Sequence, residues 1–322
     1  MQSHLRSQDR VAQALLRTLI ALPTFRNYAL LGLLSLLWGV SYNFAKVAVE
    51  TIPPLTLTAA RVAIAALLLG AVLRASGVAV FSSRYPWRLL IIQAAMINIV
   101  PWSLSAWAAQ TVDSGLVAVL NSTSPIFAFF ITWAITRHEP TTGAKLAGAL
   151  AGLAGVVLIV GVGVVSDIGG QVPQQLACVL GAILFGIAAV HGRRFDALPP
   201  LVPATLTLIV GAAVLMPLSL VIDRPWSLAP SRSSLIAAGC LAVFSTAAAL
   251  YLYYRILGTL GSIAAASQSY LRIVVGVAVG IVFLGESLTL ERLAGIVLIL
   301  AGVIAMTRPA ASIRKIQAGG AR

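Results

Sequence analysis

Acidic residues are scarce in this chain and are absent from the middle of its apolar stretches. Of the 322 residues, 9 are Asp or Glu and 3 are His, and charged residues make up 10% of the sequence. A soluble domain carries roughly 25% charged residues, so the composition excludes an ordinary soluble protein. A proton relay within a membrane normally needs a carboxylate or a histidine at depth. Coupling through a buried carboxylate is therefore disfavoured.

Motifs for metals, nucleotides and catalysis are also missing. The 2 cysteines, Cys178 and Cys240, lie in apolar stretches without the Cys or His spacing of a zinc or haem site. No G-x-x-x-x-G-K-[ST] loop is present for ATP. An intramembrane enzyme would need a base or a metal beside its nucleophile, and the many serines have no such neighbour at depth. We expect no cofactor, no metal, no ATP dependence and no enzymatic activity.

Long apolar stretches account for most of the chain. Hydrophobic residues make up 59% of the sequence, and they form ten stretches of roughly 18–25 residues, each long enough to span the hydrocarbon core of a bilayer. These stretches lie near residues 28–49, 55–75, 89–110, 115–135, 143–164, 175–192, 200–222, 234–256, 261–284 and 290–307. The sequence therefore predicts an all-α integral membrane protein with ten transmembrane helices in a lipid bilayer.

Basic residues are distributed unevenly between the loops. The formal net charge is +13, but the 22 Lys and Arg are spread over short loops, which argues against nucleic-acid binding. With a cytoplasmic N-terminus, sixteen of them face the cytoplasm, three face the other side, and Lys46, Arg61 and Arg272 lie within spans. Cytoplasmic loops carry such an excess. We expect both termini to be cytoplasmic, with an interfacial helix in segment 1–27 and a basic tail at 308–322.

The sequence matches itself at an offset of 147 residues. The matches include charged, proline and aromatic positions: Trp38-Gly39 with Phe185-Gly186, Pro53 with Pro200, Glu139 with Glu286, and Ala154-Gly155-Val156 with Ala301-Gly302-Val303. We therefore divide the chain into two five-helix repeats, 28–165 and 175–307. Because five is odd, the second repeat enters the membrane in the opposite direction. Inverted repeats of this kind are typical of transporters.

Several motifs resemble a known family. They are Trp38-Gly39-x-x-Tyr42-Asn43-x-x-Lys46, Leu120-Asn121-x-x-x-Pro125 and, in the second repeat, Tyr270-Leu271 and Gly285-Glu286. Together they are similar to EamA-type members of the drug/metabolite transporter superfamily, over residues 28–307. The resemblance implies ten helices in a bacterial inner membrane and the export of small metabolites, often amino acids. It is greatest to the aromatic amino-acid exporter (YddG) branch.

One position departs from the family pattern. A proline usually follows Tyr-Leu-x in the second repeat, whereas Ile273 stands there, preceded by Arg272. We therefore expect the ninth helix to be less kinked than in relatives. Arg272 lies near the middle of this span, and freed carbonyls, a water-filled cavity or a substrate carboxylate would each compensate its charge. Arg61, at a position where the family commonly has arginine, is interpreted as structural.

Polar side chains within spans are costly and tend to face a cavity or another helix. On this ground, the candidate substrate-binding residues are Tyr42, Asn43, Asn98, Trp102, Asn121, Ser245, Gln268, Tyr270 and Arg272. The offset pairs Asn98 with Ser245 and Asn121 with Gln268, which predicts a shared central cavity. The alternative is that these groups only form hydrogen bonds between helices and hold the bundle together.

The function favoured by these features is secondary transport. We expect a carrier or facilitator that exports a small metabolite by alternating access, and amino acids with apolar or aromatic side chains fit best. The alternatives are an exporter of another drug or metabolite, or a channel, although a channel would be expected to show rings of charge or carbonyl motifs. No oligomeric state is predicted.

Overall fold

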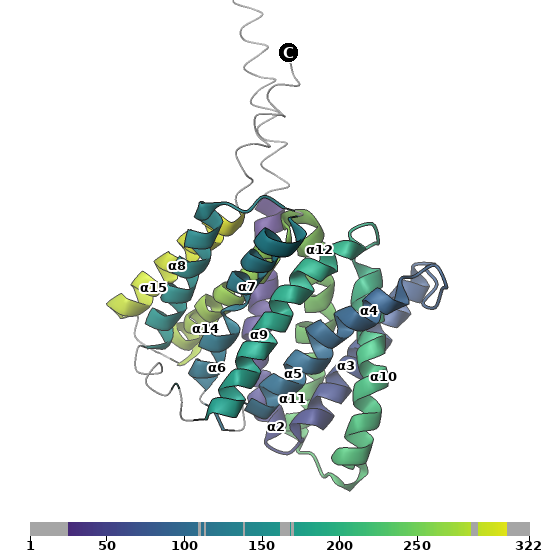
Figure 1. Cartoon of the computed structure of the whole chain (residues 1–322). Helices are drawn as coiled ribbons and strands as arrows, with labels where there is room; N and C mark the ends of the chain where they lie inside the picture. The colour runs from purple at the N-terminus through teal and green to yellow at the C-terminus, as the bar shows by residue number, and fades with distance from the viewer. Residues whose placement is uncertain are drawn as a thin grey trace, which may run out of the picture.

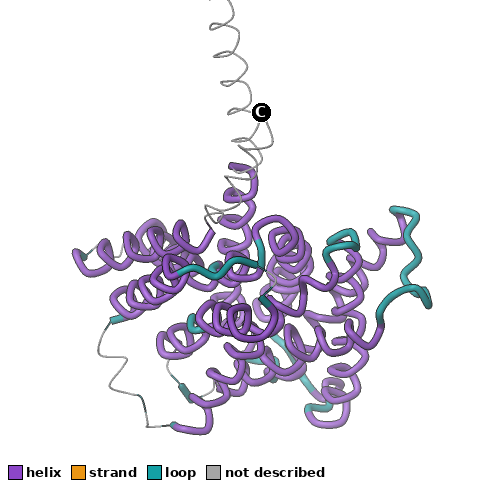
Figure 2. Tube along the Cα trace, turned by 45° about the horizontal axis from the view of Figure 1, so that its top comes forward, coloured by secondary structure: helices purple, strands orange, loops and turns teal. Residues whose placement is uncertain are grey.

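The computed structural model describes residues 25–108, 111–112, 114–137, 139–161, 168, 171–284 and 289–307. Most of the expected cytoplasmic segment 1–27 and the whole basic tail 308–322 lie outside these residues. The described part of the chain is built from helices joined by short loops, without strands (Figures 1 and 2). The predicted all-α membrane fold is thereby confirmed.

Helices follow the expected spans closely. Residues 25–39 are helical, and the later elements are α2 Ser41–Val49, α3 Pro54–Ala75, α4 Trp87–Ala94, η1 Ala95–Ile99, α5 Val100–Ala108, α6 Ser114–Asn121, α7 Ser124–Ile131, η2 Thr132–Thr136, α8 Gly143–Val160, α9 Val172–Gly192, η4 Arg193–Phe195, α10 Leu201–Ile222, η5 Pro225–Ser227, α11 Arg232–Ala242, η6 Val243–Ala248, α12 Ala249–Leu260, α13 Ser262–Ala266, α14 Gln268–Leu284 and α15 Leu290–Thr307. Among the described residues, 8 helical segments are long and apolar enough to cross a membrane. The other two expected spans are interrupted, at Val40 and at Ser267.

Helix starts have ordinary chemical causes. Thr142 and Ser231 are the N-caps of α8 and α11, and each side chain accepts a hydrogen bond from a backbone N–H three residues later. Such caps satisfy donors that have no partner within the helix. At the start of α3, Asp223, which directly follows α10, accepts from the backbone N–H of Thr56 at 2.8 Å and from its hydroxyl at 2.7 Å. A carboxylate is favourable at a helix N-terminus, so this contact joins the two repeats.

Glycines bring α8 and α15 into backbone contact. A Cβ atom on Gly148 would lie 2.7 Å from the Gly302 carbonyl oxygen, and one on Gly155 would lie 2.6 Å from that of Gly295. Each contact is the image of the other under the 147-residue offset. The earlier glycine of α8, Gly148, meets the later glycine of α15, Gly302, and the later one, Gly155, meets the earlier one, Gly295, so the two helices are antiparallel. An inverted repeat requires this arrangement.

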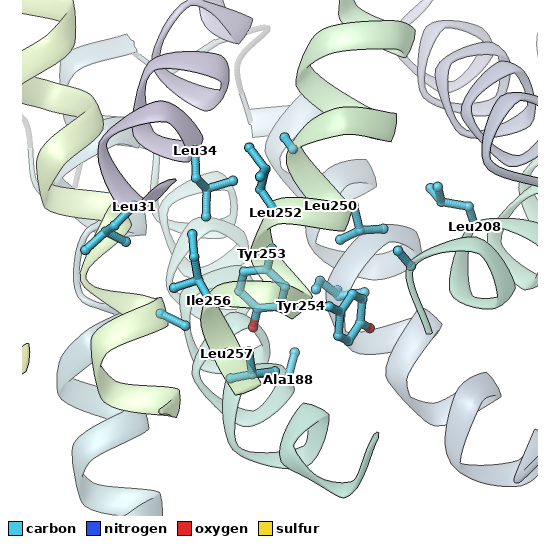
Figure 3. Packing of buried hydrophobic residues seen from close by; sticks show 14 of the residues in the cluster. Leu31, Leu34, Ala188, Leu208, Leu250, Leu252, Tyr253, Tyr254, Ile256 and Leu257 are labelled. Atoms are coloured by element: carbon cyan, nitrogen blue, oxygen red, sulfur yellow. The ribbon is translucent and has the colours of Figure 1, made fainter. Parts of the chain in front are cut away.

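The helix pairs define the two ends of the bundle. Figure 1 shows α8 beside α15 at one edge and α3 beside α10 at the other, with α9 between them. Buried side chains of α12 pack in between: Tyr253, Tyr254 and Leu257 belong to one buried cluster with Ala188 of α9 and Leu208 of α10, and Leu257 lies beside Ala188 (Figure 3). Helices in lipid associate through such close packing rather than through exclusion of water.

Candidate functional site

Breaks in the fourth and ninth transmembrane spans meet. The fourth span breaks at Ser122 and Thr123, between α6 and α7, and the ninth breaks at Ser267, between α13 and α14. The Ser122 hydroxyl donates to the Ser269 carbonyl oxygen at 3.3 Å, and these residues are 147 positions apart. Residues that are equivalent in the two repeats can touch only near the pseudo-twofold axis. Broken helices at the repeat interface are where transporters of this architecture bind their substrates.

The break in the ninth span does not depend on a proline. Pro125 lies in the first turn of α7, whereas Arg272 occupies the equivalent position in α14. The ninth span, expected to be less kinked, is nevertheless interrupted because hydroxyls bond back to the preceding turn. Ser267 donates to the Ala264 carbonyl at 2.6 Å, and Ser269 to the Ala266 carbonyl at 3.0 Å. Such bonds compete with the helical pattern.

Asn121 and Gln268 place two unsatisfied acceptors beside these breaks. Their side chains are 3% and 8% exposed, and among the described residues the Asn121 Oδ1 and Gln268 Oε1 atoms have no hydrogen-bond partner. Asn121 Oδ1 faces Gly181 of α9, 3.8 Å from the position of a Cβ there. A buried amide oxygen without a donor costs about 1–3 kcal/mol. The structure therefore retains two costly acceptors next to the axis.

Asn98 lies between α3 and α10 instead. Its Nδ2 donates to the Thr207 carbonyl oxygen at 3.1 Å, and its Oδ1 faces Gly211, with Val62 alongside. Asn98 belongs to the π-helical turn η1, and its equivalent Ser245 belongs to the π-helical turn η6. π-helical turns free backbone carbonyls and recur at functional sites. Here they occur at matching places in the third and eighth spans.

Ser245 and Tyr270 are occupied by contacts between helices. The Ser245 hydroxyl donates to the Leu37 carbonyl at 2.7 Å, and the Ser245 carbonyl accepts from Trp38 Nε1 at 3.0 Å. Tyr270 is fully buried, and its hydroxyl donates to the Ala149 carbonyl at 2.7 Å. These contacts match the interpretation in which polar groups hold the bundle together.

Arg61 and Trp102 form a pair that sequence reasoning missed. The Arg61 guanidinium carbon lies 4.3 Å from the centre of the Trp102 ring, and Arg61 Nε donates to Thr246 Oγ1 at 2.9 Å. Both side chains are half-buried. The available signal was a lone arginine in one span and a tryptophan in another, but no spacing rule joins residues of different helices.

The remaining candidates occupy the first and ninth spans. Tyr42 and Asn43 lie on α2, and their side chains lie outside the described part of the structure. Arg272 lies on α14 and is half-buried. Its backbone oxygen packs against Gly39, 3.1 Å from the position of a Cβ there. Gly186, the equivalent of Gly39, packs in the same way on α7, with the Ser124 oxygen at 3.1 Å.

Glu139 connects the first repeat to the second. Its Oε1 accepts from the backbone N–H groups of Ser262 and Ile263 at 3.1 and 3.2 Å, and also from the Ser262 hydroxyl. Lys145 Nζ lies 3.8 Å from the other carboxylate oxygen. Glu139 therefore caps α13, just after Gly261, which has a φ of +90°. Glu139 is one of the positions at which the two repeats match in sequence, and its equivalent, Glu286, lies outside the described residues.

These features define a class of protein. Inverted units whose broken helices meet at the pseudo-twofold axis are the architecture of a secondary transporter. The model of the EamA-like transporter family matches residues 26–161 and again residues 173–308. The chain belongs to this family, within the drug/metabolite transporter superfamily, and is a membrane transporter rather than an enzyme.

Individual relatives agree with this assignment. The chain is 27% identical over 279 residues to the "Uncharacterized inner membrane transporter YedA" of Escherichia coli (strain K12), covering 84% of this chain and 87% of that protein. It is 24% identical over 294 residues to the "Uncharacterized transporter YvbV" of Bacillus subtilis (strain 168), covering 88% and 92%. A solved structure described as "Crystal structure of protein" superposes with a TM-score of 0.72 at 23% identity, covering 86% and 96%. That similarity supports the fold.

Proposed function

We propose that this transporter exports amino acids with apolar or aromatic side chains across a bacterial inner membrane by alternating access. The observation that carries the proposal is the pair of buried acceptors, Asn121 Oδ1 and Gln268 Oε1, at the meeting point of the broken helices. An ammonium group donates hydrogen bonds and would satisfy such acceptors. Their near-symmetrical placement suits a site that opens to either side in turn.

The roles within this site follow from the contacts described above. Asn121 and Gln268 would receive the substrate amine, and Trp102 would offer an aromatic face to its side chain. Tyr42 and Asn43, on α2, remain proposed lining residues. Asn98, Ser245 and Tyr270 are reassigned to positioning the helices, since each donates to a backbone carbonyl.

The arrangement in the membrane is part of the same proposal. Repeats 28–165 and 175–307 would move relative to each other, with both termini in the cytoplasm, as the excess of basic residues predicts. Export of another small metabolite is the second candidate, because amide acceptors bind any N–H donor. A channel is less consistent with these features, since a buried site occluded between broken helices suits a carrier.

Counterflow in proteoliposomes tests the proposal. Purified protein is reconstituted into liposomes loaded with unlabelled phenylalanine, leucine or glycine, and uptake of the same labelled amino acid is followed. A carrier accelerates uptake when substrate is present on the opposite side, and phenylalanine and leucine should exceed glycine. Uptake without such trans-stimulation would indicate a channel. Uptake no faster than in protein-free liposomes would refute amino-acid transport.

A further inference from the structure

Arg61 carries a positive charge into the helix bundle. It lies seven residues into α3, roughly 10 Å along the helix from its start. Thr58 and Ala65, each one turn away, are 4% and 0% exposed, whereas Ile64, also one turn away, is 38% exposed, so Arg61 lies at the edge of the buried face. Its contacts with Trp102 of α5 and Thr246 of η6 direct the side chain toward the bundle. A charge at such depth in a membrane protein is expensive and usually marks a substrate or ion pathway.

Two neighbours hold the guanidinium group in place without neutralising it. Trp102 of α5 covers one face, with its ring centre 4.3 Å from the guanidinium carbon. Thr246 of η6 accepts from Arg61 Nε, while its own hydroxyl donates to the Leu241 carbonyl. Stacking on tryptophan and one hydrogen bond fix the plane of the group. Both neighbours are uncharged, so the positive charge remains.

No carboxylate of the described chain pairs with Arg61. The ion pairs found there join Glu139 to Lys145 and Asp196 to Arg193. The only hydrogen bond that Arg61 makes within this part of the structure uses Nε. Its two terminal nitrogens are thus available, and the side chain is half-buried rather than sealed. The terminal edge of a guanidinium matches the two oxygens of a carboxylate.

Arg61 is linked to the acceptors at the broken helices through α5. Pro101, which precedes Trp102, lies beside Gly181 of α9, 3.9 Å from the position of a Cβ there. Asn121 Oδ1 lies 3.8 Å from the same point. Pro101 and Trp102 of α5 therefore lie between the Arg61 guanidinium, whose terminal nitrogens are available, and the buried acceptor Asn121 Oδ1. A zwitterion has the complementary groups, a carboxylate and an ammonium.

We propose that Arg61 binds the carboxylate of the transported substrate, and that Trp102 holds the guanidinium in position for it. The inference deepens the proposed function, on which it rests, by assigning the acidic group of the amino acid to a particular side chain. It competes with the hypothesis that Arg272 has this role. One singly charged guanidinium matches one carboxylate in charge as well as in shape.

The test compares a substrate that carries a carboxylate with one that does not. Transport of phenylalanine and phenylalaninamide is measured in proteoliposomes for the wild type, Arg61→Gln, Arg61→Lys and Arg272→Gln. The matched control is Arg74→Gln, which removes the same charge from an exposed position in the last turn of α3. Arg61→Gln should weaken the apparent affinity for phenylalanine about 10- to 150-fold. It should change that for the amide less than about 3-fold.

The other variants separate binding from stability. Arg61→Lys keeps the charge but loses the planar edge, so its loss for phenylalanine should be intermediate. If Arg61→Gln does not fold, as judged by its thermal unfolding in detergent, Trp102→Phe takes its place. Its loss should be larger for phenylalanine than for the amide, because both substrates lose part of the indole face but only phenylalanine has the carboxylate that Arg61 binds. Equal losses for both substrates, or a loss specific to phenylalanine in Arg272→Gln alone, would overturn the assignment.

A separate outcome identifies failure of the proposed function. If the wild type transports no amino acid, amino-acid export is refuted, and binding of 3-phenylpropionate is measured instead by thermal shift. Binding to the wild type that is lost in Arg61→Gln and kept in Arg74→Gln would support the carboxylate site. Absence of binding to the wild type would overturn it.

Discussion

Ser122 donates a hydrogen bond to the carbonyl oxygen of Ser269, the residue at its own position in the other repeat. The contact places both helix breaks near the pseudo-twofold axis. A substrate bound on this axis would have equivalent residues of the two repeats on either side of it, and it would still have them after the repeats exchange conformations. Asn121 and Gln268 are such an equivalent pair beside the contact, so their substitution tests whether they bind the substrate.

Asn121→Leu and Gln268→Met should weaken transport without destabilising the protein. The amide oxygens have no partner among the described residues, so an apolar side chain of similar size removes a cost of burial. The melting temperature in detergent should stay the same or rise. The apparent affinity for the substrate should fall about 2- to 12-fold, the equivalent of one lost hydrogen bond of about 0.5–1.5 kcal/mol. Ser122→Ala is the control for local packing, and a drop in melting temperature with unchanged affinity would contradict the proposed role.

Gly155→Ala should destabilise the contact between α8 and α15. The new Cβ would lie 2.6 Å from the Gly295 carbonyl oxygen, and separation of the helices is expected to cost about 1–3 kcal/mol. Gly239→Ala is the control, because nothing lies within 4 Å of a Cβ at that position. Thermal unfolding of the purified variants should show a lower melting temperature for Gly155→Ala only. Equal melting temperatures would show that the two helices are free to move apart.

Glu139→Ala should lower stability more than Lys145→Met does. The Glu139 carboxylate accepts from two backbone N–H groups and a hydroxyl at the start of α13, whereas its pair with Lys145 is long, at 3.8 Å. We expect a loss of about 1.5–3 kcal/mol for the charged hydrogen bonds and less than about 1 kcal/mol for the ion pair. Urea unfolding of both variants provides the comparison. A larger loss in Lys145→Met would reverse the ranking of the two contacts.

Tyr270→Phe should reduce stability and leave substrate preference unchanged. The variant keeps the buried ring but loses the bond to the Ala149 carbonyl, at an expected cost of about 0.5–1.5 kcal/mol. The ranking of phenylalanine, leucine and glycine in counterflow should match that of the wild type. A changed ranking would return Tyr270 to the binding site.

Uptake should be insensitive to a protonophore. Among the described residues, every Asp and Glu lies in a loop or at a helix end: Glu50, Glu139, Asp196, Asp223 and Glu291. His191 Nδ1 is 2.8 Å from Gln93 Oε1, near the end of α9. Labelled substrate should therefore equilibrate across the liposome membrane. Accumulation that collapses with the pH gradient would contradict this, and His191→Gln would then identify the group responsible.

The helices and their duplication could be predicted because both determine regular features of the sequence, namely the lengths of the apolar stretches and the constant offset between matching residues. Apolar length predicts spans, and a constant offset predicts equivalent residues such as Gly148 and Gly295. The break at Ser267 was not predicted, because the expectation of a less kinked ninth helix rested on the absence of a proline and not on the nearby serine hydroxyls. Side-chain back-bonding depends on rotamers, which the order of residues does not specify.

The candidate site was harder to predict because polarity alone does not say which way a side chain points. Asn98 and Asn121 are the same residue type, each within a span, yet Asn98 packs against α10 while Asn121 faces α9. The Arg61–Trp102 contact involves two helices whose relative rotation is set by the whole bundle. A contact of this kind, between segments far apart in the sequence, can be found only from a three-dimensional structure.

The α8–α15 contact has the form of an isologous dimer interface, in which one surface pairs with a copy of itself. Before duplication, a single five-helix unit inserted in both orientations would have made both glycine contacts with one stretch of sequence. Fusion into one chain freed the copies to change separately. Arg272 at the position equivalent to Pro125, and Arg61 without a matching cation at Leu208, record that divergence within a symmetrical frame.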